Sequence, residues 1–216
     1  MLALYGHLFS SYTWKALIAL YANDTEFEFR GVGEEQPGHD AFVAAASPQG
    51  LFPVLVDGSE TVIEATSIIE YLQLNHPGPA PLLPHDPAAA IRVRMIDRVF
   101  DNYVMGIMQQ SVAEAIRTGG QPDVAVLEMV STKLDRSYAW IDNWLAEYPI
   151  TDTVTLIECA AAPSLFYADW VHEIPPQFAR LRAWRTHLLA LPAVVRCVDD
   201  ARPYRHYFPL GAPDRD

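Results

Sequence analysis

A proline-rich segment, HPGPAPLLPHDPA at residues 76–88, divides this chain into two stretches of different pattern. Proline lacks the backbone N–H that helices and central strands need, so neither kind of element continues through the five prolines of this segment. Strand-like and helix-like patterns alternate before the segment, whereas only helical patterns follow it. We therefore predict two domains, residues 1–77 and residues 88–216, joined by a linker at residues 78–87.

The first domain carries the signals of a small α/β unit. Strands are predicted at LALY, FEFRGV and FPVLV, and the last of these turns at DGSE into TVI. Helices are predicted at about residues 12–22 and 66–74. The alternation indicates an α/β unit with a hairpin near its end.

The second domain is predicted to be helical throughout. Over residues 95–116, apolar pairs recur every four residues, a spacing that drifts by about 40° per step on a helix of 3.6 residues per turn. This helix is therefore covered on several sides or kinked near Gly106. A second helix is predicted at about residues 123–146, and a third near Thr155, where TLIE is a capping box formed with Glu158. Two more are predicted in PPQFARLRAWRTHLLAL and PAVVRCVDDA, each with a proline at or near its first turn.

The charge of the chain argues against a nucleic-acid surface. The formal net charge is −12, whereas binding to phosphates requires clustered lysine and arginine. Residues 1–90 hold two basic side chains against eleven acidic ones, a balance of −9, and residues 91–216 have a balance of −3. The two domains therefore differ in charge as well as in pattern.

The composition indicates a soluble, cytoplasmic protein. Hydrophobic residues make up 50% of the chain, and no apolar run approaches the roughly 20 residues of a membrane span. The two cysteines, Cys159 and Cys197, fit neither a redox pair nor a zinc site, so we predict buried, reduced thiols. We expect no metal, no membrane and no nucleic acid among the partners of this protein.

Three neighbouring hydroxyl groups, those of Ser10, Ser11 and Tyr12, stand where the first helix begins, in the stretch FSSYTWK. A thiol held beside such a hydroxyl at a helix N-terminus is stabilised as the thiolate, which is the nucleophilic form. A serine at this position is also an ordinary helix cap. The stretch by itself leaves both interpretations open.

Two further features mark element boundaries in the first domain. In SPQGLFPVLVDG, Pro53 begins a strand, either as an edge-strand proline or after a cis bond that exposes the neighbouring backbone groups. In IEATSIIEYL, a strand ends at Ile63 and a helix starts near Thr66. The N-terminus of that helix is either capped by Thr66 or open to a carboxylate or phosphate ligand.

Taken together, these features resemble the cytosolic glutathione transferases along nearly the whole chain. Their order is an opening strand, a hydroxyl-bearing loop, a G-x-x-P strand entry, a glutamate at a strand-to-helix junction, a proline linker and a helical half with a T-x-x-E box. The stretch SSYTWK is similar to the zeta-like signature S-S-C-x-W-R of serine-type members, with Tyr12 in place of the cysteine. The resemblance implies a thioredoxin-like domain that binds glutathione, an all-helical domain that completes a pocket for an electrophile, a homodimer and a role in detoxification.

The resemblance also implies which residues meet the glutathione sulfur. Ser10 occupies the position of the catalytic serine and would donate a hydrogen bond that lowers the pKa of the thiol. Ser11 and Tyr12 are the alternative donors, and Tyr5 takes this role only in a tyrosine-type enzyme.

Other residues are implied to hold the rest of the glutathione molecule. Phe52, ahead of a cis Pro53, would offer its backbone N–H and C=O to the cysteinyl part. Glu64 matches the glutamate of the family's E-S pair, which holds the γ-glutamyl group. His39 is the candidate to meet the glycyl carboxylate.

Some positions depart from the family pattern. Ala65 stands where the E-S pair has serine, so Thr66 or helix N–H groups must meet the γ-glutamyl carboxylate instead. Leu51 stands where many relatives carry a basic or amide side chain. Because the first domain and glutathione are both anionic, we expect weak binding of glutathione unless Arg94 or Arg98 reaches the site.

The electrophile pocket is predicted between the loop after LALY and the helix that holds Tyr103, Met105 and Met108. The aromatic tail at residues 204–208 is expected either to fold over this pocket or to pack elsewhere.

Three functions follow from this interpretation. The leading one is a transferase that adds the glutathione thiolate to a small apolar electrophile. The second is a zeta-like enzyme that uses glutathione as a cofactor for cis–trans isomerisation of a diketo acid. The third is a glutathione transferase fold reused as a non-catalytic binding module, which the acidic first domain and the changes at Ala65 and Leu51 favour.

Overall fold

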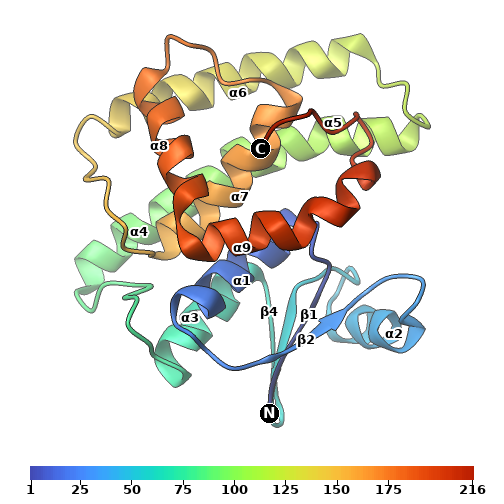
Figure 1. Ribbon diagram of the computed structural model, residues 1–216, viewed down its shortest axis with the longest axis vertical. Coiled ribbons are helices and arrows are strands. Elements are labelled where there is room, and N and C mark those ends of the chain that lie inside the picture. The colour runs from blue at the N-terminus through green and yellow to red at the C-terminus, as the bar shows by residue number, and fades with distance from the viewer.

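The computed structural model describes all 216 residues of the chain. A sheet part, residues 2–75, is followed by a helical part, residues 87–207 (Figure 1). None of the helices combines the length and the apolar character that crossing a bilayer requires. The elements are, in chain order, β1 (Leu2–Gly6), α1 (Ser11–Ala22), β2 (Glu28–Gly31), α2 (Pro37–Ala46), β3 (Val54–Asp57), β4 (Glu60–Ile63), α3 (Ala65–Asn75), α4 (Pro87–Phe100), the π-helical η1 (Asp101–Met105), α5 (Gly106–Arg117), α6 (Val124–Trp144), α7 (Leu156–Val171), α8 (Ala179–Ala190), α9 (Pro192–Ala201) and the 3₁₀-helical η2 (Arg202–Tyr207).

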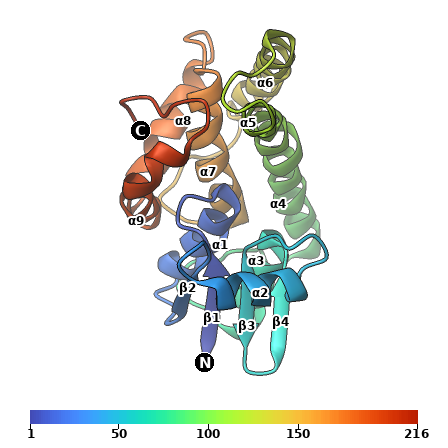
Figure 2. The same cartoon turned by 90° about the vertical axis from the view of Figure 1, so that its right-hand side faces the viewer.

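The sheet is covered by helices on both faces (Figure 2). Its strand order is β2-β1-β3-β4, with β1 parallel to β2 and antiparallel to β3, and with β4 antiparallel to β3. Successive side chains of a strand point to opposite faces, so Leu2 and Leu4 join the core that contains α1 and α3, whereas Tyr5 packs with Val43 of α2. Strand β1 is therefore buried along its whole length.

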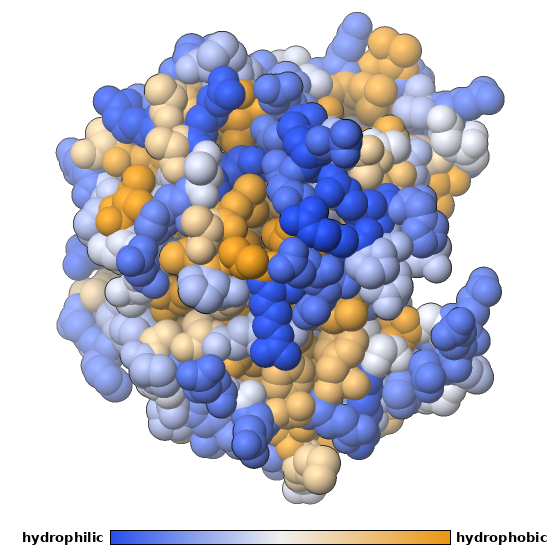
Figure 3. Space-filling model, viewed as in Figure 1, coloured by the Kyte–Doolittle hydropathy of each residue, from blue (hydrophilic) through white to orange (hydrophobic).

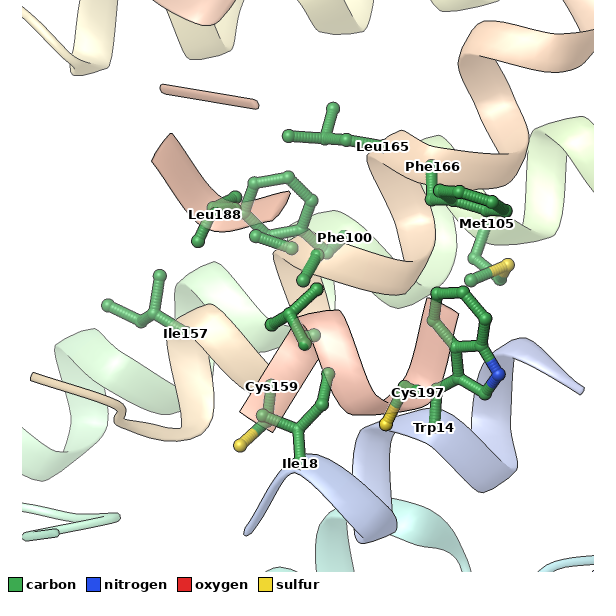
Figure 4. Close-up of a cluster of buried hydrophobic side chains, with 14 of the residues drawn as sticks. Trp14, Ile18, Phe100, Met105, Ile157, Cys159, Leu165, Phe166, Leu188 and Cys197 are labelled. Atoms are coloured by element: carbon green, nitrogen blue, oxygen red, sulfur yellow. The ribbon is translucent and has the colours of Figure 1, made fainter. Parts of the chain in front are cut away.

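Helix α1 belongs to the sheet part but also packs into the helical part (Figure 4). Trp14 is fully buried, its ring centre lies 4.9 Å from that of Phe166 in α7, and its indole N–H donates a hydrogen bond to the Leu8 carbonyl over 2.6 Å. Ile18, one turn further on, lies in the same apolar cluster. The position of the first turn of α1 is consequently determined by both parts of the molecule.

The long helix after the proline-rich segment is interrupted at the place the sequence indicated. Helix α4 passes into the five-residue π-helical segment η1, which ends immediately before Gly106. A Cβ atom at Gly106 would lie 3.1 Å from the Asp101 carbonyl oxygen, so glycine suits this close passage. Single π turns inside α-helices often occur at functional sites.

The predicted order, an α/β part followed by helices alone, is confirmed. The capping box is also confirmed, because the Thr155 hydroxyl accepts from the backbone of α7 and the Glu158 carboxylate accepts from the Thr155 N–H over 2.9 Å. Helix α2 was not predicted, because it buries only Val43 and so lacks a helical apolar pattern. Helix α8 starts three residues after Pro176, so its prolines lie before its first turn and not in it.

Candidate functional site

The first turn of α1 presents three hydroxyl groups at the boundary between the two parts. Ser10 is the N-cap of this helix, and its Oγ accepts a hydrogen bond from the Thr13 N–H over 3.3 Å. This bond leaves the hydroxyl proton of Ser10 free to donate. Ser11 is 5% exposed, and its hydroxyl has no hydrogen-bond partner in the protein. Both serines can therefore donate to a ligand.

These hydroxyl groups face a cavity of about 440 Å³, which we call the hydroxyl cavity. Ser10, Ser11 and Tyr12 line one side of it, and Met108 and Val112 of α5 line the other. No lysine, arginine, aspartate or glutamate lines the hydroxyl cavity. In the space-filling view the outline of the molecule is indented on the right, between the helical part above and the sheet part below, where α5 and α2 lie (Figure 3).

Tyr12 contributes a phenol that keeps its proton. Burial, together with the negative charges of Asp101 and Glu64, raises the pKa of Tyr12 to about 12. The phenolic O–H is therefore a hydrogen-bond donor at neutral pH and is not a tyrosinate. The start of α3 lies close to the first turns of α1, because the Lys15 ammonium donates to the Thr66 hydroxyl over 2.9 Å.

The backbone around Phe52 is open to a ligand. The Phe52–Pro53 peptide bond is cis, which was one of the two alternatives predicted from the sequence. Phe52 lines the hydroxyl cavity, and neither its N–H nor its C=O has a hydrogen-bond partner in the protein. A peptide backbone lying in an extended conformation can pair with both groups.

The start of α3 is a second set of unpaired backbone donors. Glu64, the residue before the helix, has a positive φ of 69° and does not cap the helix with its side chain. Ala65 is buried and carries no hydroxyl. The N–H groups of the first helical turn therefore remain available to a carboxylate.

The hydroxyl of Thr66 is not available to a ligand. It accepts a hydrogen bond from the Lys15 ammonium over 2.9 Å and donates one to the Asp97 carboxylate over 3.0 Å. Lys15 also forms ion pairs with Asp97 and, over 2.8 Å, with Asp101. Burial raises the pKa of Asp97. This buried charge cluster of Lys15, Thr66, Asp97 and Asp101 joins α1, α3, α4 and η1. It argues against the Thr66 hydroxyl, the first of the two alternatives for the missing serine, and favours the second, the helix N–H groups.

Three other predicted residues lie away from the hydroxyl cavity. His39 directs its Nδ1 to the Gly31 carbonyl over 2.8 Å and packs against the ring of Tyr5, so it does not reach the site. Tyr5 itself accepts a hydrogen bond from Arg30 on the α2 side of the sheet. Tyr103 is 59% exposed because the π turn places Val104 and Met105 inward at this point.

The two arginines considered for glutathione binding are also engaged elsewhere. Arg94 forms a two-bond ion pair with Glu70 of α3, over 2.6 and 2.9 Å. Arg98 lies beside the carboxylates of Asp97 and Asp101, at 3.5 and 3.8 Å. Neither arginine lines the hydroxyl cavity.

The structure also brings residues to the cavity that the sequence did not single out. His7 and Phe9 come from the loop after β1, Gln109 from α5 and Tyr167 from α7. The Tyr167 hydroxyl donates to the Phe9 carbonyl over 2.8 Å and so holds this loop against the helical part. The four-residue apolar spacing pointed to α5 in general, but no sequence signal distinguished His7 or Tyr167.

Part of the aromatic tail lies at the cavity, which was one of the two alternatives expected for it, whereas Tyr204 lines the neighbouring hollow. Tyr207 and Phe208 both line the hydroxyl cavity, and so does Pro209. Met108 lines it as well, so the prediction placed α5 correctly beside the β1–α1 loop.

Comparison with known proteins agrees with this geometry. A family model described as "Glutathione S-transferase, N-terminal domain" matches residues 4–80. The GST-like protein YibF of Escherichia coli K12, described as uncharacterized, is 32% identical over 174 residues, which cover 80% of this chain and 84% of YibF. A maleylpyruvate isomerase of a Ralstonia species is 28% identical over 98% of both chains. Among solved structures, the holo form of a maleylpyruvate isomerase, a bacterial glutathione S-transferase of the zeta class, has a TM-score of 0.74 at 27% identity and matches 99% of this chain and 100% of its own.

Proposed function

This chain belongs to the glutathione S-transferase family, and we propose that it activates the glutathione thiol at the first turn of α1 for attack on a small apolar electrophile. The family assignment confirms the resemblance seen in the sequence and the interpretation of the chain as a glutathione-dependent enzyme. The choice of reaction rests on one observation. The cavity beside the three hydroxyl groups has a volume of about 440 Å³ and carries no formally charged lysine, arginine, aspartate or glutamate side chain.

Glutathione is an extended peptide, and two sets of unpaired backbone groups suit its parts: those of Phe52, which lines the cavity, and those at the start of α3, which lies outside the lining. The N–H and C=O of Phe52 would pair with the backbone of the cysteinyl residue, which brings the sulfur to the first turn of α1. The N–H groups at the start of α3 would bind the γ-glutamyl carboxylate. Because Ala65 lacks a hydroxyl and that of Thr66 is engaged, we expect weaker binding than a serine at position 65 would give.

The proposed chemistry depends on stabilisation of the thiolate and on proximity. A donated hydrogen bond from Ser10 or Ser11, together with the positive end of α1, favours the thiolate over the thiol. The sulfur then attacks an electrophile that the apolar walls hold within reach, and a carbon–sulfur bond forms. Tyr207 and Phe208 add two aromatic rings to this apolar lining.

Isomerisation is the second candidate, because the relatives that match nearly the whole chain include a maleylpyruvate isomerase. Such a substrate carries two carboxylates, which require cationic groups for binding. In the hydroxyl cavity the only side chain that can become a cation is His7, and burial lowers the pKa of His7. The lining therefore favours transfer to an uncharged electrophile over isomerisation of a dicarboxylate.

We also propose that the protein is a homodimer in the cytoplasm. Leu74 of α3 and Ile91 and Met95 of α4 are exposed apolar side chains on adjoining helices, and a second copy would cover them. Cys159 and Cys197 are free, buried thiols, which suit a reducing compartment.

The proposal is tested by measuring two activities of the purified protein side by side. One assay follows conjugation of glutathione to a panel of uncharged electrophiles, and the other follows isomerisation of maleylpyruvate with glutathione present. We expect the higher kcat/KM in the conjugation assay. Isomerisation alone would support the second candidate, and inactivity in both assays would support a non-catalytic binding protein.

A further inference from the structure

His7 stands where the hydroxyl cavity meets a second hollow. The second hollow has a volume of about 640 Å³ and lies against the end of β2 and residues 33–36. His7 and Tyr207 line both spaces. The imidazole is held by aromatic rings of η2, with its centre 4.8 Å from that of Tyr204 and 6.0 Å from that of Tyr207. His7 is therefore a fixed polar group in an otherwise mostly apolar wall.

A hydrogen bond to the backbone determines the tautomer of His7. The Phe9 N–H donates to His7 Nδ1 over 3.1 Å, and a backbone N–H can only donate. Nδ1 is therefore the unprotonated nitrogen, so a neutral ring carries its proton on Nε2. Burial lowers the pKa of His7, which favours this neutral ring at pH 7.

The Nε2–H group of His7 has nothing to bind in the protein itself. Nδ1 makes the only hydrogen bond of the imidazole. Nε2 is not among the fully buried side-chain atoms that lack a partner, so it is not sealed in the core, and His7 lines both hollows. An asparagine at position 7 would also accept from the Phe9 N–H, because asparagine side chains form turns of this kind. The local turn therefore does not by itself require an imidazole.

We infer that the Nε2–H of His7 is a catalytic hydrogen-bond donor to the electrophile, and that the site favours electrophiles whose reacting carbon is conjugated to a carbonyl group. This inference rests on the proposed function. The hydroxyl groups of the first turn of α1 serve the sulfur, whereas His7 stands on the loop at the boundary of the cavity. Outside the first turn of α1, Gln109 of α5 and the Tyr207 hydroxyl are the other neutral donors of the lining that have no partner in the protein.

The step proposed for an enone is an addition. The thiolate sulfur attacks the β carbon and forms a carbon–sulfur bond, and the π electrons of the C=C bond move toward the carbonyl oxygen. The resulting enolate oxygen accepts a hydrogen bond from His7 Nε2–H, and the α carbon then takes a proton from water. His7 keeps its own proton throughout, so its contribution is to stabilise charge that develops in the transition state.

The test compares two electrophiles in the wild type and in two variants of His7. A benzyl halide reacts by displacement and has no conjugated oxygen, whereas an enone of similar size needs the donor. The asparagine side chain of His7→Asn keeps an acceptor for the Phe9 N–H, but it is too short to place a donor where His7 Nε2 lies. The longer glutamine side chain of His7→Gln places an amide N–H close to that position. For His7→Asn we expect the loss of kcat/KM for the enone to exceed the loss for the benzyl halide by about tenfold to a hundredfold. For His7→Gln we expect the ratio of the two rates to stay near that of the wild type.

Two results would overturn the inference. An equal loss with both electrophiles in His7→Asn would show that His7 only shapes the loop, and a selective loss of the enone reaction in Gln109→Leu but not in His7→Asn would assign the donor to Gln109. Absence of conjugation with both electrophiles in the wild type would contradict the proposed function, and this inference with it.

Discussion

Two successive turns of α1 place polar groups in opposite surroundings. The first turn carries Ser10, Ser11 and Tyr12, which line a cavity without lysine, arginine or carboxylate side chains. One turn further on, Lys15 is 1% exposed and is surrounded by Thr66, Asp97 and Asp101. The same helix thus contributes a site with unpaired donors and a cluster in which every charge has a partner.

The difference separates a binding site from a structural contact. A buried ion pair is costly to desolvate and is strongly destabilising when one partner is removed, so the Lys15 cluster fixes α1 against α3, α4 and η1. Unpaired hydroxyl and N–H groups beside a cavity instead gain by binding a ligand. We expect changes in the second turn to alter stability and changes in the first turn to alter activity.

The largest effect is expected for Lys15→Met. This change leaves the buried carboxylate of Asp97 with only the exposed Arg98, 3.5 Å away, as a cationic neighbour, and it should lower the free energy of unfolding by about 3–5 kcal/mol, measured by urea denaturation. The double variant Lys15→Met with Asp97→Leu should recover part of the loss, because it removes the unpaired charge as well. A loss below about 1 kcal/mol in the single variant would mean that the cluster is not a structural contact.

A smaller effect is expected for Tyr167→Phe, which deletes the hydroxyl bonded to the Phe9 carbonyl. Loss of this bond should cost about 1–3 kcal/mol and should also lower kcat/KM, because the β1–α1 loop lines the cavity. Tyr138→Phe is the matched control, since its buried hydroxyl donates to the His172 carbonyl over 3.2 Å and Tyr138 does not line the cavity. Equal kcat/KM in the two variants would argue against a role for the loop position in catalysis.

An effect of about 1 kcal/mol is expected for each of two helix caps, Ser10 and Thr155. Both side chains accept a hydrogen bond from the first turn of their helix. Ser10→Ala and Thr155→Ala should therefore lower the free energy of unfolding by similar amounts, but only Ser10→Ala should lower the rate of conjugation. An unchanged rate of conjugation in Ser10→Ala would mean that Ser10 acts only as the N-cap of α1.

The smallest effect is expected for Arg94→Ala. The Arg94–Glu70 pair joins α3 to α4 but is solvent-exposed, with 43% and 32% of the two side chains accessible. Its removal should cost about 1 kcal/mol or less and the cost should shrink with added salt, in contrast to Lys15→Met. A loss of stability as large as that of Lys15→Met would mean that the exposed Arg94–Glu70 pair stabilises the fold as much as the buried Lys15 cluster does.

The sequence predicted those features that depend on local chemistry. Pro53 after a loop, the T-x-x-E box at Thr155 and the apolar spacing around Gly106 each act within a few residues, and the structure has a cis bond, a capping box and a π turn at these places.

The features that sequence reasoning missed depend on contacts between distant segments. The burial of Lys15 depends on carboxylates more than 80 residues away in the chain. The outward position of Tyr103 depends on the phase shift of the π turn, which a spacing rule for a regular helix does not include. The position of His7 at the cavity depends on η2, a segment almost 200 residues later in the chain, whose Tyr204 packs against the imidazole.

The most direct test of the central claim is the ultraviolet thiolate absorbance of glutathione bound to the wild type and to Ser10→Ala, with affinity measured by calorimetry on the same samples. We predict that the wild type binds glutathione with a thiolate signal near neutral pH and that Ser10→Ala keeps most of the affinity while losing the signal. Retention of the full signal in Ser10→Ala, or no binding by the wild type at millimolar glutathione, would contradict the assignment of the first turn of α1 as the site of thiol activation.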